Sequence, residues 1–151
     1  MGLDTTHDAF HGGYGSYTTL REALLIAAGY KVDDKAYPPM CIWDDDTQDI
    51  DSTKPEWDRA RLGEIDRDEW PWDPIIYLWA HEDCDGIIKP AMAGAIADRI
   101  EELLPKIQAA TLTFAPAWAD STRGRTTTTM ASQFLSGLRE ASLAGEDVEF
   151  M

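Results

Sequence analysis

The middle of the chain carries an apolar run followed at once by a polar loop: Pro74-Ile75-Ile76-Tyr77-Leu78-Trp79-Ala80-His81-Glu82-Asp83-Cys84-Asp85-Gly86. A short continuous apolar run of this kind, with two Ile and two aromatic residues, is typical of a β-strand that is buried on both faces. We therefore predict a strand over residues 74–80, with the polar side chains of residues 81–86 at its end. A polar loop held by a rigid element is a common place for a functional site.

Helices and short strands are expected on either side of this run. Capping residues and helical spacing predict helices from about 16–19 to Gly29, from Pro90 to a break or kink at Pro105, and over about 130–144. Short strands are predicted at 30–32, 40–43 and 148–150. Together these elements predict an α+β fold: a single compact domain over residues 1–151, with about three helices packed on a small sheet.

Residues 44–73 differ in composition from the rest of the chain, and we call them the acidic stretch. They hold twelve acidic side chains against four basic ones, a net charge of −8. Three tryptophans, Trp57, Trp70 and Trp72, are spaced along it. Because buried tryptophans anchor a segment to a core, we predict an irregular excursion fastened to the domain by its aromatic residues.

The charge balance restricts the kinds of partner. Twenty-eight acidic and 13 basic residues give a formal net charge of −15. Such a field repels phosphate backbones and anionic lipids, so direct binding to nucleic acid or to a membrane is disfavoured. It attracts basic surfaces, such as the grooves of proteins that bind nucleic acid. The alternative is that the negative charge only keeps the protein soluble. With only two cysteines and no long apolar run, we predict a cytoplasmic protein with reduced thiols.

The three histidines all lie in two short segments, residues 7–12 and 81–86. Three imidazoles with a carboxylate or thiolate are a sufficient ligand set for Zn²⁺ or a similar divalent ion. Such a site requires the first segment to fold back against the second. The candidate metal ligands are His7, His11, His81, Asp83, Cys84 and Asp85. Glu82 or Asp8 is then the candidate catalytic base for a metal-bound water in a small metal-dependent hydrolase.

A purely structural role for both segments is the alternative. His7 and His11 can pack their rings near a surface turn, while Asp83 and Asp85 cap the following helix and Gly86 completes a tight turn. The sequence carries no complete set of catalytic residues for nucleophilic chemistry. Whether the protein is an enzyme, whether a metal is bound, and which oligomer it forms are therefore left open by the sequence.

Three stretches of the chain carry a resemblance to known proteins. They are Met1-Gly2-Leu3-Asp4-Thr5-Thr6-His7-Asp8-Ala9-Phe10-His11-Gly12, the central segment 81–86 with residues 96–105, and residues 134–138 with 145–150. Together they resemble small uncharacterised proteins of bacteriophages and prophages. The resemblance excludes the acidic stretch. It implies an accessory protein of the host bacterial cytoplasm. The small size, the net charge of −15 and the lack of a complete catalytic set favour a protein that acts by binding, for instance an inhibitor of a host defence system that uses its acidic surface on a basic host protein. The alternatives are the metal-dependent hydrolase and a structural or virion-associated protein.

Overall fold

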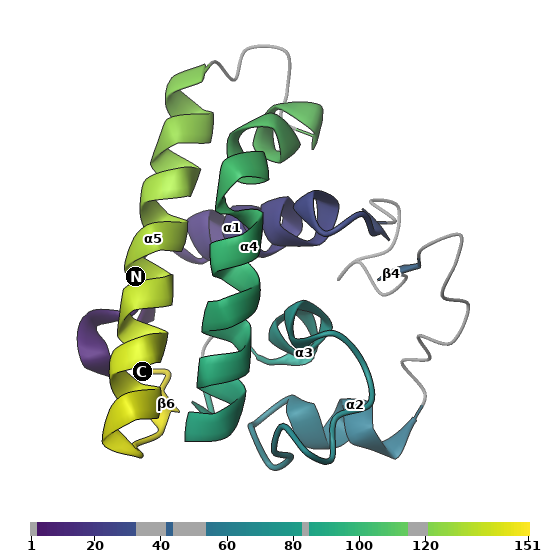
Figure 1. Cartoon of the computed structure of the whole chain (residues 1–151), viewed down its shortest axis with the longest axis vertical. Helices are drawn as coiled ribbons and strands as arrows, with labels where there is room; N and C mark the ends of the chain where they lie inside the picture. Colours follow the sequence, from purple (N-terminus) through teal and green to yellow (C-terminus); the bar gives the residue numbers. More distant parts are fainter. Residues whose placement is uncertain (1–2, 33–41, 44–53, 83–84, 115–120) are drawn as a thin grey trace.

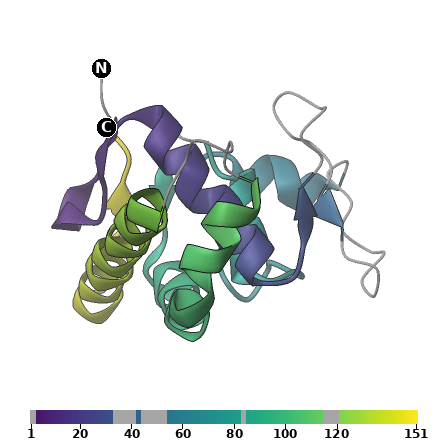
Figure 2. The same cartoon turned by 90° about the horizontal axis from the view of Figure 1, so that it is seen from above.

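Two long helices form the spine of the molecule. The computed structural model describes residues 3–32, 42–43, 54–82, 85–114 and 121–151. Helix α4 (Pro90–Phe114) and helix α5 (Ser121–Ala144) lie side by side and antiparallel, and α1 (Tyr14–Ala27) packs across them (Figures 1 and 2). Their facing sides are apolar at helical spacing, as in Ile96, Ile100, Phe134 and Leu138, all fully buried.

The predicted strand at 74–80 is wrong, because these residues form helix α3 (Pro74–Ala80). Asp73 caps the helix, since its Oδ1 accepts a hydrogen bond of 2.9 Å from the Ile75 amide, and Pro74 occupies the first turn. A helix that is buried on nearly all sides shows the same continuous apolar run as a buried strand, so periodicity cannot separate the two. The other short helix, α2 (Pro55–Ala60), lies in the acidic stretch.

The strands are short antiparallel pairs. β1 (Leu3–Asp4) pairs with β2 (His11–Gly12), β3 (Lys31–Val32) with β4 (Ile42–Trp43), and β5 (Ile87–Ile88) with β6 (Val148–Glu149). A bridge between Thr5 and Phe150 joins the first pair to the third. The α+β class is therefore confirmed, as is a strand at 148–149, while the described residues hold five α-helices rather than about three.

The ends of α1 and α5 agree with the predicted positions, whereas the starts of both helices and the end of α4 differ from them. Gly29 and Gly145 follow α1 and α5 with φ of 96° and 69°, the left-handed conformation in which glycine ends a helix. In contrast, α1 begins at Tyr14 and not at 16–19, α4 runs through Pro105 without ending there, and α5 begins well before residue 130.

The tryptophans of the acidic stretch pack against one another and against the core in the part of the stretch that is described. The ring centroids of Trp70 and Trp72 are 4.8 Å apart, and Trp57 lies 6.2 and 6.3 Å from them. Trp70 also meets Tyr77 of α3 edge-on at 5.5 Å, which ties residues 54–73 to the core. Residues 44–53 lie outside the described part of the chain.

Candidate functional site

His81 is a buried part of the core. It follows α3, is 1% exposed, and its ring lies 4.7 Å from that of Phe150. Its Nδ1 lies 2.7 Å from the carbonyl oxygen of Glu82 and its Nε2 lies 2.7 Å from that of Ile87. Because both ring nitrogens already face backbone carbonyls, the ring can bind a metal ion only if one of these contacts breaks.

Burial lowers the pKa of His81, and the two carbonyl contacts oppose this shift without cancelling it. The charge of nearby Arg21, whose Nη1 donates to the His81 carbonyl at 3.0 Å, lowers the pKa further. A neutral ring can donate to only one of these two carbonyl oxygens.

His7 lies between two glutamates from the C-terminal part of the chain. It belongs to a short 3₁₀ turn, η1 (Thr6–Asp8), and its backbone has the left-handed φ of 59°. Its Nε2 is 3.2 Å from Glu146 Oε2, and its Nδ1 is 3.8 Å from Glu140 Oε1. The two carboxylates thus approach opposite nitrogens of the ring, so they cannot share one metal ion with it.

Three more candidate residues in the described part of the chain are engaged separately. The exposed His11 pairs with Asp4 across the β1–β2 ladder, Glu82 pairs with Arg61, and Asp85 accepts a bond of 2.8 Å from the Gly86 amide. Gly86 has a φ of 90°, which fits the predicted tight turn.

In the described ranges, which omit Asp83 and Cys84, no three His, Cys, Asp or Glu side chains are grouped so that they could hold a metal ion. The backbone of residues 3–12 does approach residues 81–86 through Phe150, which bridges to Thr5 and donates its amide to the Gly86 carbonyl at 3.0 Å. The histidines of that segment, however, contact Asp4, Glu140 and Glu146 rather than His81.

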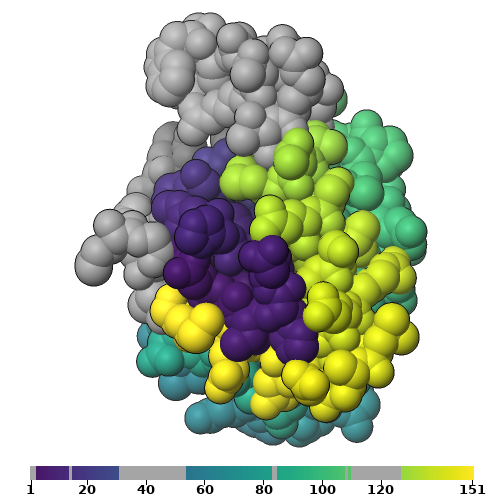
Figure 3. Space-filling view, turned by 90° about the vertical axis from the view of Figure 1, so that its left-hand side faces the viewer, coloured from purple at the N-terminus to yellow at the C-terminus, as the bar shows by residue number. Residues whose placement is uncertain are grey.

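The structure instead brings together a group of carboxylates that sequence analysis missed. Residues 3–12 lie directly against residues 140–151 on one side of the molecule (Figure 3). We call the exposed side chains of these two segments the acidic face; neither segment contains Lys or Arg. Its carboxylates are Asp4, Asp8, Glu140, Glu146, Asp147 and Glu149, and all six residues are exposed.

Hydrogen bonds join the two segments of the acidic face. The amide of Glu149 donates to Thr6 Oγ1 at 2.9 Å, and that of Met151 donates to the Asp4 carbonyl at 2.8 Å. From α5, Gln133 Nε2 donates to the Asp8 carbonyl at 3.1 Å. These bonds hold the backbones of the two segments against each other.

Close packing holds the first segment on α5. A Cβ atom at Gly137 would lie 2.4 Å from Ala9 Cα, so only glycine allows this approach. The neighbouring Phe10 is buried, with its ring edge-on to Tyr17 at 5.1 Å. Segment 3–12 is therefore part of the packed structure.

The nearest arginine to the acidic face in sequence, Arg139, is occupied elsewhere. Its Nη2 lies 2.7 Å from Glu101 and 3.3 Å from Asp98, both on α4. It therefore neutralises carboxylates of α4 and not those of the acidic face. Within the two segments of the acidic face, the only side chains that can carry a positive charge are the imidazoles of His7 and His11. This absence of Lys and Arg before Arg21 and after Arg139 is the sequence signal that could have indicated the face.

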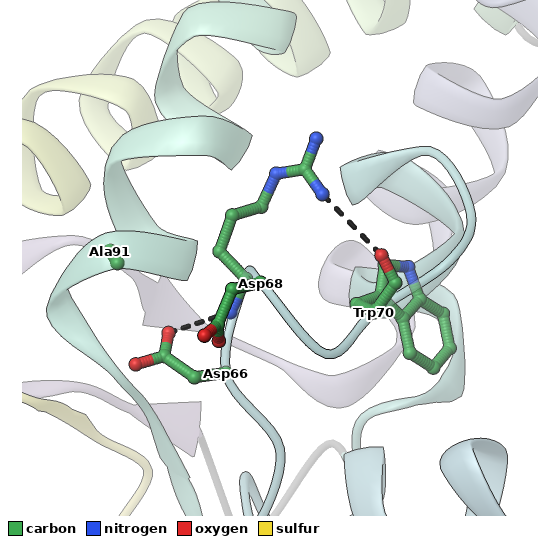
Figure 4. A pocket seen from close by; sticks show the side chains of 5 residues that line it. Asp66, Asp68, Trp70 and Ala91 are labelled. Carbon is green, nitrogen blue, oxygen red and sulfur yellow. Dashed lines mark hydrogen bonds between the residues drawn. The ribbon is translucent and has the colours of Figure 1, made fainter.

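A shallow depression of about 650 Å³ lies near the start of α4 (Figure 4). It is lined by Asp66, Arg67, Asp68, Trp70 and Ala91. Its polar groups already bond one another: Asp66 Oδ1 accepts from the Arg67 amide at 2.7 Å, and Arg67 Nη1 donates to the Trp70 carbonyl at 3.4 Å. The depression does not present a nucleophile together with a base, so it does not form a catalytic arrangement.

Comparison with protein-family models, with curated proteins and with solved structures found no match for the chain. In the part of the chain that the structure describes, no helix combines the length and the apolar character needed to cross a bilayer.

Proposed function

We propose that the protein acts by binding a basic surface on another protein through its acidic face. The observation that carries this proposal is the set of six exposed carboxylates contributed by two segments without Lys or Arg that lie against each other (Figure 3). The side chains of Asp4, Glu140 and Glu146 are 53%, 70% and 63% exposed, so they are available to a partner.

The electrostatics of the whole chain favour the same kind of partner. A formal net charge of −15 attracts basic proteins and accelerates their encounter, with an effect that salt weakens. The packing of segment 3–12 on α5 orders the backbone that carries Asp4 and Asp8 before binding, which lowers the ordering cost of association. A groove that normally holds nucleic acid is a suitable partner, because its lysines and arginines are arranged for negative charge.

The biological setting that we propose comes from the resemblance of three stretches to bacteriophage and prophage proteins. In that setting the protein works in the bacterial cytoplasm as an accessory factor, and its partner belongs to a host defence system. Binding at a nucleic-acid groove would inhibit that partner by competition with its substrate.

The test compares two variants of equal charge. Asp8→Asn, Asp147→Asn and Glu149→Gln together remove three carboxylates of the acidic face without altering the contacts of His7. Asp58→Asn, Glu64→Gln and Asp68→Asn remove three exposed carboxylates from the acidic stretch as a matched control. Proteins captured from bacterial lysate at low salt are identified and purified, and their dissociation constants are then measured with wild type and with both variants.

The proposal predicts that the acidic-face variant binds a captured basic protein about tenfold more weakly, as expected from three charge contacts of about 0.5 kcal/mol each. The control variant should retain most of the affinity, and added nucleic acid should displace the wild-type protein. Equal weakening by both variants would mean that net charge alone drives binding, and an unchanged affinity in the acidic-face variant would place the binding surface elsewhere.

A further inference from the structure

We propose that Asp85 and Gly86 form a site of spontaneous isomerisation, at which the main chain is rerouted through the side chain of Asp85. The product is an isoaspartyl residue, and its formation requires no enzyme and no reagent other than water. The consequence for the fold is a weaker attachment of strand β6. This inference is independent of the proposed function, and its test needs no binding partner.

The sequence singles out this pair of residues. The chain contains no asparagine, and Asp85 is its only aspartate that is followed by glycine. Isomerisation begins when the amide nitrogen of the following residue attacks the carboxyl carbon of an aspartate side chain. Because glycine has no Cβ, it leaves the attacking nitrogen unhindered and the backbone free to rotate. An aspartate before glycine therefore reacts more readily than an aspartate before a larger residue.

The turn at residues 85–86 holds the two reacting groups together. Asp85 is exposed, and its Oδ1 accepts a hydrogen bond of 2.8 Å from the Gly86 amide. The attacking nitrogen therefore lies beside the carboxyl group that it attacks. In the part of the chain that the structure describes, the Gly86 amide donates to no backbone carbonyl. The attack at this nitrogen thus costs no hydrogen bond of a helix or strand.

Asp66 provides an internal comparison. Its Oδ1 accepts a bond of 2.7 Å from the Arg67 amide, so the carboxyl group and the following amide meet as they do at Asp85. Arg67, however, carries a long side chain, whose Nη1 donates to the Trp70 carbonyl at 3.4 Å. Asp66 shares the hydrogen bond of Asp85 and lacks the glycine, so the two sites separate the contribution of geometry from that of the following residue.

The reaction balances with water alone. The Gly86 nitrogen bonds to Cγ of Asp85, the amide hydrogen and the carboxyl hydroxyl leave as one water molecule, and a succinimide ring forms. Another water molecule then adds to the main-chain carbonyl carbon of Asp85, and the bond from this carbon to the Gly86 nitrogen breaks. The former main-chain carbonyl becomes a free carboxylate. The chain now continues through Cβ and Cγ and is longer by one methylene group.

The fold around Gly86 leaves no room for a longer main chain. A Cβ atom at Gly86 would lie 2.8 Å from Leu62 Cα, so the two backbones are already in close contact. The Gly86 carbonyl accepts a bond of 3.0 Å from the Phe150 amide, and the Ile87 amide donates to the Leu62 carbonyl at 3.2 Å. A methylene group inserted just before Gly86 displaces these groups. The bond to Phe150 and the pairing of β5 with β6 are therefore weakened.

The experiment follows the full chain during incubation for several weeks in ¹⁸O-labelled water at neutral pH and physiological temperature. Opening of the ring adds one ¹⁸O atom to the reacting residue, and electron-transfer fragmentation of the digested protein locates both the label and the isoaspartate. Asp85→Glu is the matched control, because it keeps the charge while the larger ring that glutamate requires forms far more slowly. A sample of the wild-type chain unfolded in urea shows what the sequence supports without the fold.

We expect Asp85 to be the main labelled aspartate of the folded chain, with little label at Asp66. In the isomerised protein, purified by chromatography, the Phe150 amide should exchange its hydrogen about tenfold faster than in fresh protein, the change expected from the loss of one hydrogen bond. The amide of Ala93 in α4 is the reference and should change little. After the same incubation, Asp85→Glu should show neither the label at residue 85 nor the faster exchange.

Three results would overturn the inference. The absence of label at Asp85 in the folded chain would refute the site, and label in the unfolded sample would then show that the fold prevents the attack. Equal label at Asp66 and Asp85 would show that the glycine does not select the site. Unchanged exchange of the Phe150 amide in the isomerised protein would refute the weaker attachment of β6.

Discussion

Replacing Gly137 with alanine should loosen the contact between segment 3–12 and α5. The added Cβ would lie 2.4 Å from Ala9 Cα, 2.5 Å from Ala9 Cβ and 2.8 Å from Ala9 N. Two of these atoms belong to the backbone, so no rotamer change can relieve the overlap. The segment or the helix must move by about 1 Å to restore ordinary contact distances, in a protein interior that is densely packed.

The magnitude follows from two opposing effects. In an open helical position, Gly→Ala stabilises a protein by about 0.5–1 kcal/mol. At Gly137 the overpacking of a close contact costs about 1–3 kcal/mol, and the displaced segment also carries the buried ring of Phe10. We therefore expect a net loss of about 1–2 kcal/mol in the free energy of unfolding, or a decrease of roughly 2–8 °C in Tm for a chain of this size.

Urea unfolding followed by tryptophan fluorescence and circular dichroism measures this change. Gly15→Ala in α1 is the matched control, because its added Cβ would meet no atom within 4 Å. The control should be as stable as the wild type or more stable. If Gly137→Ala were as stable as Gly15→Ala, with unchanged amide exchange at Thr5 and Phe10, segment 3–12 would not pack on α5 as described.

Three further predictions concern the core around α3. Asp73→Ala should lower the free energy of unfolding, measured in urea, by about 2–3 kcal/mol, because it removes the cap of α3 and the partly buried ion pair with Arg99 at 3.0 Å. A loss under about 0.5 kcal/mol would contradict the stabilising role of this carboxylate. Tyr77→Phe should raise the free energy of unfolding by about 0.5–1 kcal/mol, because the fully buried hydroxyl has no hydrogen-bond partner among the described residues. A clear decrease in the melting temperature would show that the hydroxyl does have a partner. Burial lowers the pKa of His81, so the folded state takes up a proton at lower pH than the unfolded state. The contribution of His81 to the free energy of unfolding is therefore complete above about pH 6.5 and is lost as the pH falls below that value. Urea midpoints at pH 7.5, 6.5 and 5.5 should therefore fall more steeply in the wild type than in His81→Gln, and parallel curves would refute this linkage.

Local chemistry predicted several element ends but not the identity of α3. Gly29 and Gly145 were placed correctly because a glycine after a helical pattern is a rule about one residue and its backbone conformation. The apolar run at 74–80 was misassigned because burial on all sides removes the periodicity on which the assignment depends. Asp73 before Pro74 is a capping pair that the sequence already contained, and it would have favoured a helix.

The candidate site was harder to predict than the fold. The two histidine-containing segments suggested one shared centre because similar residues were grouped in the sequence. The partners of His7, however, lie more than 130 residues away on α5 and just beyond it, and only tertiary structure brings them together. The acidic face was missed for the same reason, since two of its carboxylates come from one end of the described chain and four from the other.

The central claim is that residues 3–12 and 140–151 form the surface that a basic partner binds. Its most direct measurement is NMR chemical-shift mapping of the ¹⁵N-labelled full chain during titration with a purified basic protein that the chain captures. We expect the largest amide shifts to fall in these two segments and to be smaller in Asp8→Asn/Asp147→Asn/Glu149→Gln. Shifts concentrated in residues 54–73, with both segments unaffected, would contradict it.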